Sequence, residues 1–149
     1  MIFPFVLISS FASGIIAQAI KILLKMRKSK FEPELLDSYG GMPSAHSAFL
    51  FGLLTSVAIA EGFDSTAFGI SAIMAAIMIR DALGFRMILE EHGVTLSKLA
   101  KAVKKQHPKI KDGKRYQIGH RVGHTVPEVI VGSAIGIITA TFTWWIFVM

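Results

Sequence analysis

Long runs of apolar residues divide the chain into four segments that carry few or no charges. They cover Ile2 to Leu24, Met42 to Ala60, Thr66 to Phe85 and Val126 to Val148. A helix needs about 20 apolar residues to cross roughly 30 Å of hydrocarbon. The pattern therefore predicts about four transmembrane helices, and an integral, multi-pass membrane protein.

The fourth segment carries two further features of a membrane helix. Trp144 and Trp145 lie near its far end, where aromatic residues suit the interface between lipid and water. Gly132 and Gly136 form a pair of small residues four positions apart, which permits a neighbouring helix to approach closely. We expect this helix to pack tightly inside the bundle.

The connections between the apolar segments differ in length and charge. Residues 25–41 are polar with mixed charge, residues 61–65 form a short acidic turn, and residues 86–125 form a long connection. Four spans place the first and third connections on one side of the bilayer, and both termini and the turn on the other. The predicted fold class is an all-α membrane bundle, as one domain over residues 1–149.

A basic segment at 90–121 lies within the third connection. Its apolar residues recur at helical spacing at Leu96, Leu99, Ala100 and Val103. The lysines between them are Lys98, Lys101, Lys104 and Lys105. This pattern predicts an amphipathic helix on the membrane surface, with its lysines toward anionic headgroups. We expect it to end at His107 and Pro108, with a loop at residues 111–116.

Charge is scarce and unevenly placed. Only 17% of the 149 residues are charged, against about a quarter in soluble domains, yet the formal net charge is +6. All 16 Lys and Arg residues fall in the windows 21–30 and 80–121. This excludes disorder and a nucleic-acid-binding domain with a scattered basic surface. The basic excess predicts that these two connections are cytoplasmic, at the inner or plasma membrane if the source is bacterial.

The cysteine count and the first apolar segment argue against two further kinds of feature. The chain has no cysteine, so it has neither a disulfide framework nor a metal site built on cysteine. The first apolar segment lacks a basic leader and runs too long before its first lysine. We therefore expect it to be a membrane span and not a removable signal peptide.

Each of the four segments has one end on the side of the bilayer that carries the two basic connections. Ionisable and small polar residues gather at these four ends. They are Lys21, Arg27 and Lys28 after the first segment, Gly41, Ser44 and His46 at the second, Asp81 and Arg86 at the third, and His120, Arg121, His124 and Glu128 at the fourth. Ionisable residues in or beside membrane spans are functional candidates. Helix ends rich in Arg, Lys and His predict a site for an anion.

Phosphoryl transfer through histidine fits such a site. A neutral imidazole can attack phosphorus and form a covalent intermediate, while a protonated second histidine donates to the leaving oxygen. Glu128 lies four residues after His124, so on a helix it can hold the imidazole N–H. Basic side chains and the N-terminus of the second helix can hold the phosphate oxygens without a metal. One neutral and one protonated histidine predict a bell-shaped pH profile.

Three motifs resemble a known family. Residues 43–46 read PSAH and resemble the PSGH motif of the type 2 phosphatidic acid phosphatase (PAP2) superfamily, which includes vanadium haloperoxidases. Residues 123–129 read GHTVPEV and resemble its third motif, with Glu128 where Asp is usual. With GGMPSAHSA at 40–48 and RDALGFR at 80–86, they resemble the small divergent branch often called DUF212 or YuiD-like. The resemblance runs from about Gln18 to Gly136.

The resemblance implies a reduced PAP2-like core, with four spans where typical members have six helices. It also implies that His124 is the nucleophile, Glu128 its orienting carboxylate and His46 the acid and base, with Ser44 and basic residues as phosphate ligands. Two positions depart from the superfamily pattern. Its first motif has Lys followed seven positions later by Arg-Pro, whereas Lys21 is followed by Lys28-Ser29. Its third motif has Arg six positions before the histidine, where this chain has Ile118.

We therefore predict a metal-independent lipid phosphate or lipid diphosphate phosphatase that needs no cofactor. Its catalytic residues would be His124, His46 and Glu128. We expect the rings of the two histidines to lie roughly 6–8 Å apart. The predicted phosphate-binding residues are Lys21, Arg27, Lys28, Gly41, Ser44, Asp81, Arg86 and Arg121. Expected partners are the lipid phosphate and anionic membrane lipids, with no nucleic acid; a homo-oligomer is left open.

Several alternatives stay open at this point. The chain could be a non-catalytic membrane protein that retains a phosphate pocket for lipid binding or assembly, or a small transporter subunit acting as a homo-oligomer. Asp81 and Arg86 could form a structural ion pair. His120, His124 and Glu128 recur every four residues, as in some metal sites. Glycine and proline between them, and the surrounding positive charge, argue against a metal.

Overall fold

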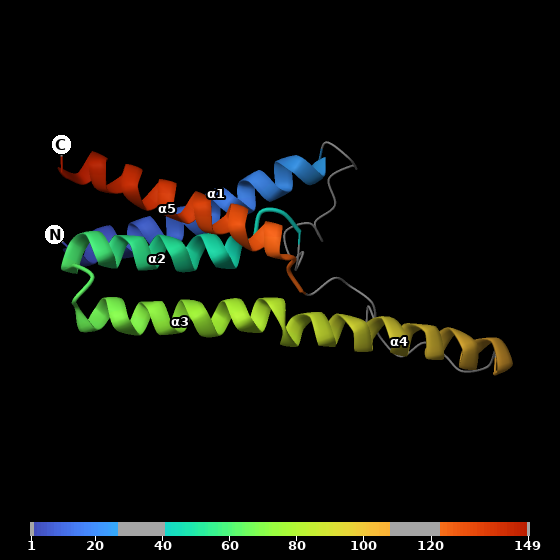
Figure 1. Ribbon diagram of the computed structural model, residues 1–149. Coiled ribbons are helices and arrows are strands. Elements are labelled where there is room, and N and C mark those ends of the chain that lie inside the picture. Colours follow the sequence, from blue (N-terminus) through green and yellow to red (C-terminus); the bar gives the residue numbers. More distant parts are fainter. Residues whose placement is uncertain (1, 27–40, 108–122, 149) are drawn as a thin grey trace.

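The computed structural model describes residues 2–26, 41–107 and 123–148. Its five helices are α1 (Ile2–Met26), α2 (Ala45–Glu61), α3 (Thr66–Leu83), α4 (Phe85–Gln106) and α5 (Val126–Val148) (Figure 1). No β-strand occurs in these ranges. The prediction of an all-α membrane bundle is therefore confirmed.

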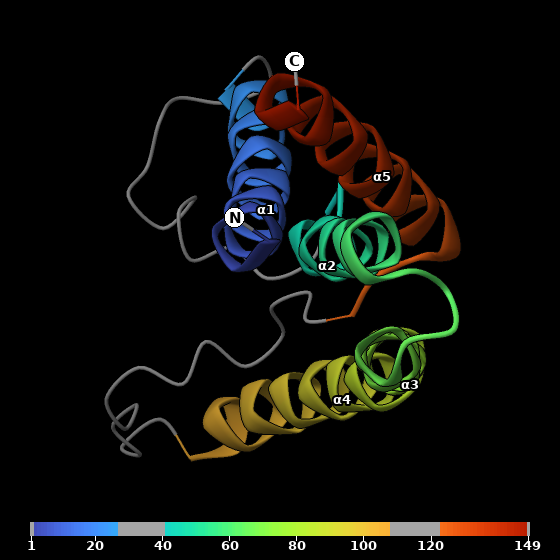
Figure 2. The same cartoon turned by 90° about the vertical axis from the view of Figure 1, so that its left-hand side faces the viewer.

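The short helix α2 is the centre of the bundle. It packs against α1, α5 and α3, and α1 also contacts α5. Seen along the bundle, α1, α2 and α5 form one group, and α3 lies on the far side of α2 (Figure 2). Residues at the start of α2 can therefore meet residues from the other helices.

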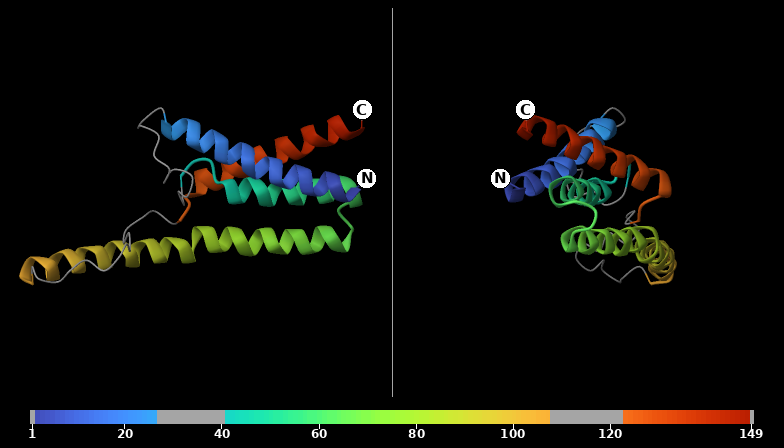
Figure 3. Two further views of the ribbon diagram at one scale, coloured as in Figure 1. Left: turned by 180° about the vertical axis from the view of Figure 1, so that it is seen from behind. Right: turned by 60° about the vertical axis from the view of Figure 1, so that its left-hand side comes forward.

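Successive helices of the bundle run in opposite directions. The end of α1, the start of α2, the end of α3 and the start of α5 lie toward one end of the bundle, and both chain termini lie at the other (Figures 1 and 3). The sequence predicted the same gathering of helix ends. Those residues singled out for phosphate chemistry that the structure describes belong to this end.

Three helical stretches are long and apolar enough to cross a membrane: Pro4–Met26, Thr66–Gln106 and Val126–Phe147. The apolar helix α2 has 17 residues, or about 26 Å, and begins at Ala45 where we expected a span from Met42. The start is later because Ser44 is extended and caps the helix, its hydroxyl accepting a hydrogen bond from the Ser47 amide. Helix α1 therefore extends farther toward this end of the bundle than the first turn of α2 does (Figure 1).

Glycines on α5 allow it to lie directly against the backbone of α2. A Cβ atom at Gly132 would collide with the carbonyl oxygen of Ser44, and one at Gly136 with that of Ala48. The close packing predicted from this pair is confirmed. At the other end of the bundle, α1 meets α5 through an edge-to-face contact of Phe5 with Trp144, whose ring centroids are 5.1 Å apart.

We expect Gly136→Leu to destabilise the bundle, because its side chain has no room against α2. Overpacking of this kind costs about 1–3 kcal/mol or more. The measurement is the fraction of monodisperse protein that remains after heating in detergent. Gly69→Leu on α3 is the matched control, since nothing lies within 4 Å of a Cβ there. Equal melting of the two variants would contradict the packing.

Helix α4 differs from expectation at its start. It begins at Phe85 and not within the basic segment 90–121. The residue before it, Gly84, has a φ of −110° and a ψ of −86°, which interrupt the helix between α3 and α4. It ends at Gln106 with His107 as its cap, as predicted. The helix extends beyond the bundle (Figure 1) and leaves the line of α3 at the junction (Figure 2). The loop predicted at residues 111–116 lies outside the described residues.

Candidate functional site

Two histidines from different helices face each other at the end of the bundle. The ring centroids of His46 and His124 are 6.2 Å apart, with 61° between the ring planes. His46 lies in the first turn of α2, and His124 lies two residues before α5 begins. His124 is 2% exposed, whereas His46 is exposed. The separation falls within the range expected for two groups acting on one phosphate.

Two hydrogen bonds hold His124. Its Nδ1 lies 3.2 Å from Oε2 of Glu128, and its backbone N–H donates to the carbonyl of Ala82 in α3. The same Glu128 oxygen accepts a hydrogen bond from the Thr125 amide at 3.1 Å. An ionised carboxylate only accepts hydrogen bonds, so Nδ1 carries the proton and Nε2 keeps its lone pair. The ring therefore presents a nucleophilic nitrogen.

The environment of His124 favours its neutral form. Burial lowers the pKa of His124 below its usual value of 6.5, the hydrogen bond that its Nδ1–H donates to Glu128 raises it, and the charges of Lys21 and Arg86 lower it further. With a lowered pKa, the imidazole is unprotonated at neutral pH. This is the state that nucleophilic attack requires.

The start of α2 is tied to α5. The Ser44 amide donates to the carbonyl of Glu128 at 3.1 Å, and the fully buried Ser44 hydroxyl accepts hydrogen bonds from the amide and the hydroxyl of Ser47. Gly41, just before, has a φ of 93°, a conformation that favours glycine. Ser44 thus caps α2 and fixes it to the segment that carries His124. The roles of Ser44 and Gly41 as phosphate ligands stay predictions.

Two cations contribute to the field around the histidines. Lys21 projects from α1 and is only 3% exposed, and its charge acts on Glu128 and on both rings. The charge of Arg86 also acts on both rings. Lys21 and Arg86 therefore stand where a phosphate between the rings would need positive charge.

Asp81 forms its ion pair with Arg86, and its charge also acts on His46. Its Oδ2 accepts a hydrogen bond from Nε of Arg86 at 2.7 Å, with both side chains partly exposed. This contact agrees with the ion-pair alternative for the two residues. A carboxylate in this position orients the guanidinium, whose other N–H groups can serve an anion.

Four of the residues singled out in the sequence lie outside the described residues. They are Arg27, Lys28, His120 and Arg121. Their parts as phosphate ligands, and the metal alternative that involves His120, stay predictions. The described residues bring together His46, His124, Glu128, Lys21 and Arg86.

Comparison with known proteins agrees with the resemblance noted in the sequence. The model of the divergent PAP2 family matches residues 4–139. The chain belongs to the divergent PAP2 family. It is 37% identical over 142 residues to "Uncharacterized membrane protein YuiD" of Bacillus subtilis (strain 168), a match that covers 90% of each chain. No solved structure matches. The chain is thus a PAP2-related membrane protein.

The structure of this divergent PAP2 protein adds a residue that the sequence did not single out. Oε2 of Glu90, on α4, accepts a hydrogen bond from the amide of Gly123 at 3.2 Å, next to His124. Met87, one turn earlier, leaves no room for a side chain at Gly123. Glu90 lies four residues after Arg86, on one face of α4. No sequence pattern pointed to this contact, because the partner of Glu90 is a backbone amide.

Proposed function

We propose that the protein is a membrane-embedded lipid phosphate or lipid diphosphate phosphatase that acts through a phosphohistidine intermediate. One observation carries the proposal: the His46 and His124 rings lie 6.2 Å apart, and Nδ1 of His124 is held by Glu128. Two histidines at this separation can bind opposite sides of one phosphoryl group. Membership of the divergent PAP2 family supports the same chemistry.

The first step forms the covalent intermediate. Nε2 of His124 attacks phosphorus, and the bond between phosphorus and the lipid oxygen breaks. Protonated His46 donates its proton to that oxygen, so the lipid leaves as an alcohol or, from a diphosphate, as a monophosphate. Glu128 stabilises the positive charge that develops on the His124 ring, because its carboxylate accepts the Nδ1 proton.

The second step returns the enzyme to its starting state. His46, now neutral, accepts a proton from water as the water oxygen attacks phosphorus. The bond between phosphorus and His124 breaks, and inorganic phosphate leaves. Lys21 and Arg86 stabilise the equatorial phosphate oxygens in both steps. No metal ion takes part in this scheme.

A lipid substrate fits the position of the site. The histidines lie at the ends of helices whose outward side chains are apolar, including Leu23 and Leu24 on α1 and Ile130 on α5. A lipid tail can lie along these side chains while its phosphate enters from the end of the bundle.

We expect purified protein in mixed micelles to release inorganic phosphate from one or more of phosphatidate, phosphatidylglycerophosphate and polyprenyl phosphate or diphosphate. Release should persist in EDTA, since the scheme uses no metal. The assay measures free phosphate against protein-free micelles. Release that EDTA abolishes and zinc restores would contradict the scheme and favour the metal alternative.

A second candidate is a non-catalytic protein that binds a lipid phosphate. The observation in its favour is the departure at Ile118 and Lys28 from the superfamily pattern of phosphate-binding residues. The same micelles distinguish the candidates: retention of a labelled lipid phosphate without release of phosphate supports binding alone.

A further inference from the structure

Helix α4 carries an apolar stripe that points away from the rest of the molecule. Its residues follow one another at alternating intervals of four and three, which keeps them on one face of a helix. They are Phe85, Leu89, His92, Leu96, Leu99 and Val103. The apolar members are between 45% and 65% exposed, and no residue of α4 is buried. The stripe thus has no partner among the described residues.

The opposite face of α4 is turned toward the site. Arg86, Glu90, Gly93 and Ser97 follow one another on this face and are half-buried. Arg86 binds Asp81, and Glu90 accepts the hydrogen bond from Gly123. Because these contacts fix which face of α4 turns inward, the apolar stripe cannot turn inward as well.

The length of α3 and α4 together shows where the stripe lies relative to a bilayer. The stretch Thr66–Gln106 has 41 residues, or about 60 Å of helix, which is twice the roughly 30 Å of a hydrocarbon core. Helix α3 alone supplies 18 residues of span. If α4 continued straight, its apolar stripe would stand in water. The interruption at Gly84, where α4 leaves the line of α3 (Figure 2), allows it to bend toward the bilayer surface.

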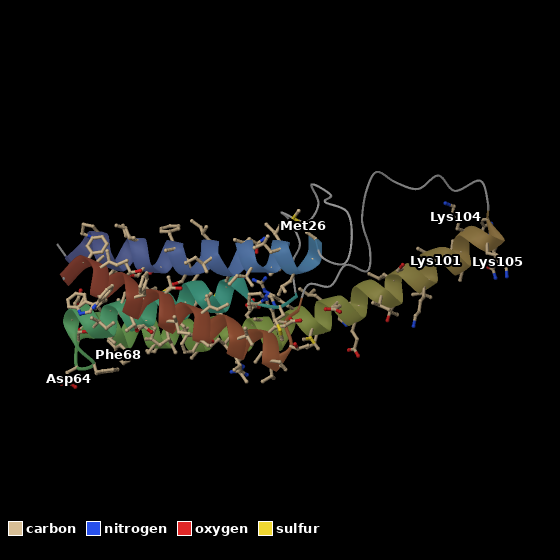
Figure 4. The ribbon with its side chains drawn as sticks, turned by 90° about the horizontal axis from the view of Figure 1, so that it is seen from above. Met26, Asp64, Phe68, Lys101, Lys104 and Lys105 are labelled. Carbon is tan, nitrogen blue, oxygen red and sulfur yellow. The ribbon has the colours of Figure 1, made fainter. Side chains whose placement is uncertain are left out.

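Positive charge lies on the polar face of α4, away from the stripe, along the second half of the helix. The exposed lysines there are Lys98, Lys101, Lys104 and Lys105. Lys101 and Lys105 point to one side of the helix and Lys104 to the other (Figure 4). The acidic residues Glu90 and Glu91 lie only in the first half. An apolar face with lysines on the polar face is typical of helices that lie in the surface of an anionic bilayer, whose headgroups attract the positive charge.

We propose that α4 docks on the surface of an anionic lipid bilayer. The apolar stripe enters the boundary between headgroups and acyl chains, and the long lysine side chains of the polar face extend to anionic headgroups. The helix lies beside the end of the bundle where the histidines gather. The apolar stripe and the lysines take no part in the proposed catalysis. The docking proposal can therefore be wrong while the proposed phosphatase activity is right, and the reverse.

The test uses the full-length protein with a reporter at one position. The chain has no cysteine, so Leu99→Cys and Ser97→Cys each accept a single environment-sensitive fluorophore. Leu99 belongs to the apolar stripe, and Ser97 lies on the opposite face as the matched control. Each labelled protein is placed in nanodiscs of phosphatidylcholine alone or mixed with phosphatidylglycerol. The measurements are the emission maximum and the quenching by aqueous acrylamide.

We expect the label at position 99 to shift to the blue and to be shielded in the anionic nanodiscs, while the label at position 97 does not respond to lipid charge. Changing Lys98, Lys101 and Lys105 to Gln should lower the ratio of docked to free helix about a hundredfold, or about fivefold per lysine. Equal quenching at position 99 in neutral and anionic nanodiscs would overturn the proposal. Shielding that ignores lipid charge and grows with the number of proteins per disc would also overturn it, in favour of a second copy.

Discussion

His124→Asn should lower phosphate release from a lipid phosphate by at least about a thousandfold. Removal of a nucleophile that acts together with a base and an orienting carboxylate costs enzymes three to six orders of magnitude, and about a thousandfold is the lower bound. Asn keeps a donor for Glu128 and fills part of the ring's volume, so the start of α5 retains its cap. The measurement is the initial rate of phosphate release in mixed micelles.

The matched control is His107→Asn. His107 caps the far end of α4, is exposed, and lies outside the histidine pair. We expect this variant to release phosphate at the wild-type rate. Quenching in alkaline detergent, in which a phosphohistidine is stable, provides a second readout with a phosphate-labelled lipid: label should attach to the wild-type chain and not to His124→Asn. A His124→Asn variant that keeps both the rate and the attached label would disprove the role of His124.

The fold could be predicted in the parts where hydropathy decides it. The apolar runs gave α1 and α5 almost to the residue, because nothing inside them competes with a helix in lipid. The start of α2 was placed too early, since hydropathy does not detect that Ser44 is extended and caps the helix. The start of α4 was placed too late, because Gly84 interrupts the helix for less than a turn and α4 resumes at once.

The candidate site could be predicted as far as chain topology decides it. His46 and His124 each stand next to the start of an apolar run, so an alternating order of spans brings them to one end. The sequence offered the pairing of Asp81 with Arg86 as an alternative, although residues five apart do not meet on an unbroken helix. The interruption at Gly84 brings them into contact. Glu90 was missed because its partner is a backbone amide, Gly123, which leaves no pattern in the sequence.

Glu128 links the hydrogen bonds at the start of α5 to the proposed chemistry of His124. It accepts hydrogen bonds from Nδ1 of His124 and from the Thr125 amide, and its own carbonyl accepts one from Ser44. The carboxylate therefore caps the start of α5 and selects the tautomer of His124 at the same time. Glu128→Gln keeps an oxygen for both hydrogen bonds and removes the negative charge, so it tests what the charge contributes.

Glu128→Gln should lower the rate of phosphate release by about two to four orders of magnitude. Oε2 of Glu128 accepts both the Nδ1 proton of His124 and the Thr125 amide, so the Gln oxygen in the same place can accept both and the ring keeps its tautomer. The amide carries no negative charge, however, so it does not stabilise the positive charge that develops on the His124 ring as Nε2 attacks phosphorus. The measurements are the rate of release and the thermal stability, and we expect the rate to change far more than the stability.

The pH profile gives an independent test of the same contact. Activity requires neutral His124, so it is lost as the pH falls through the pKa of His124, which burial sets below 6.5. The hydrogen bond and the charge of Glu128 raise that pKa against burial. Without the negative charge the pKa falls further, so the acidic limb of the residual activity of Glu128→Gln should move to lower pH. Glu128→Asp keeps a carboxylate and should keep the acidic limb closer to that of the wild type; an acidic limb that moves to higher pH in Glu128→Gln would contradict the proposed contact.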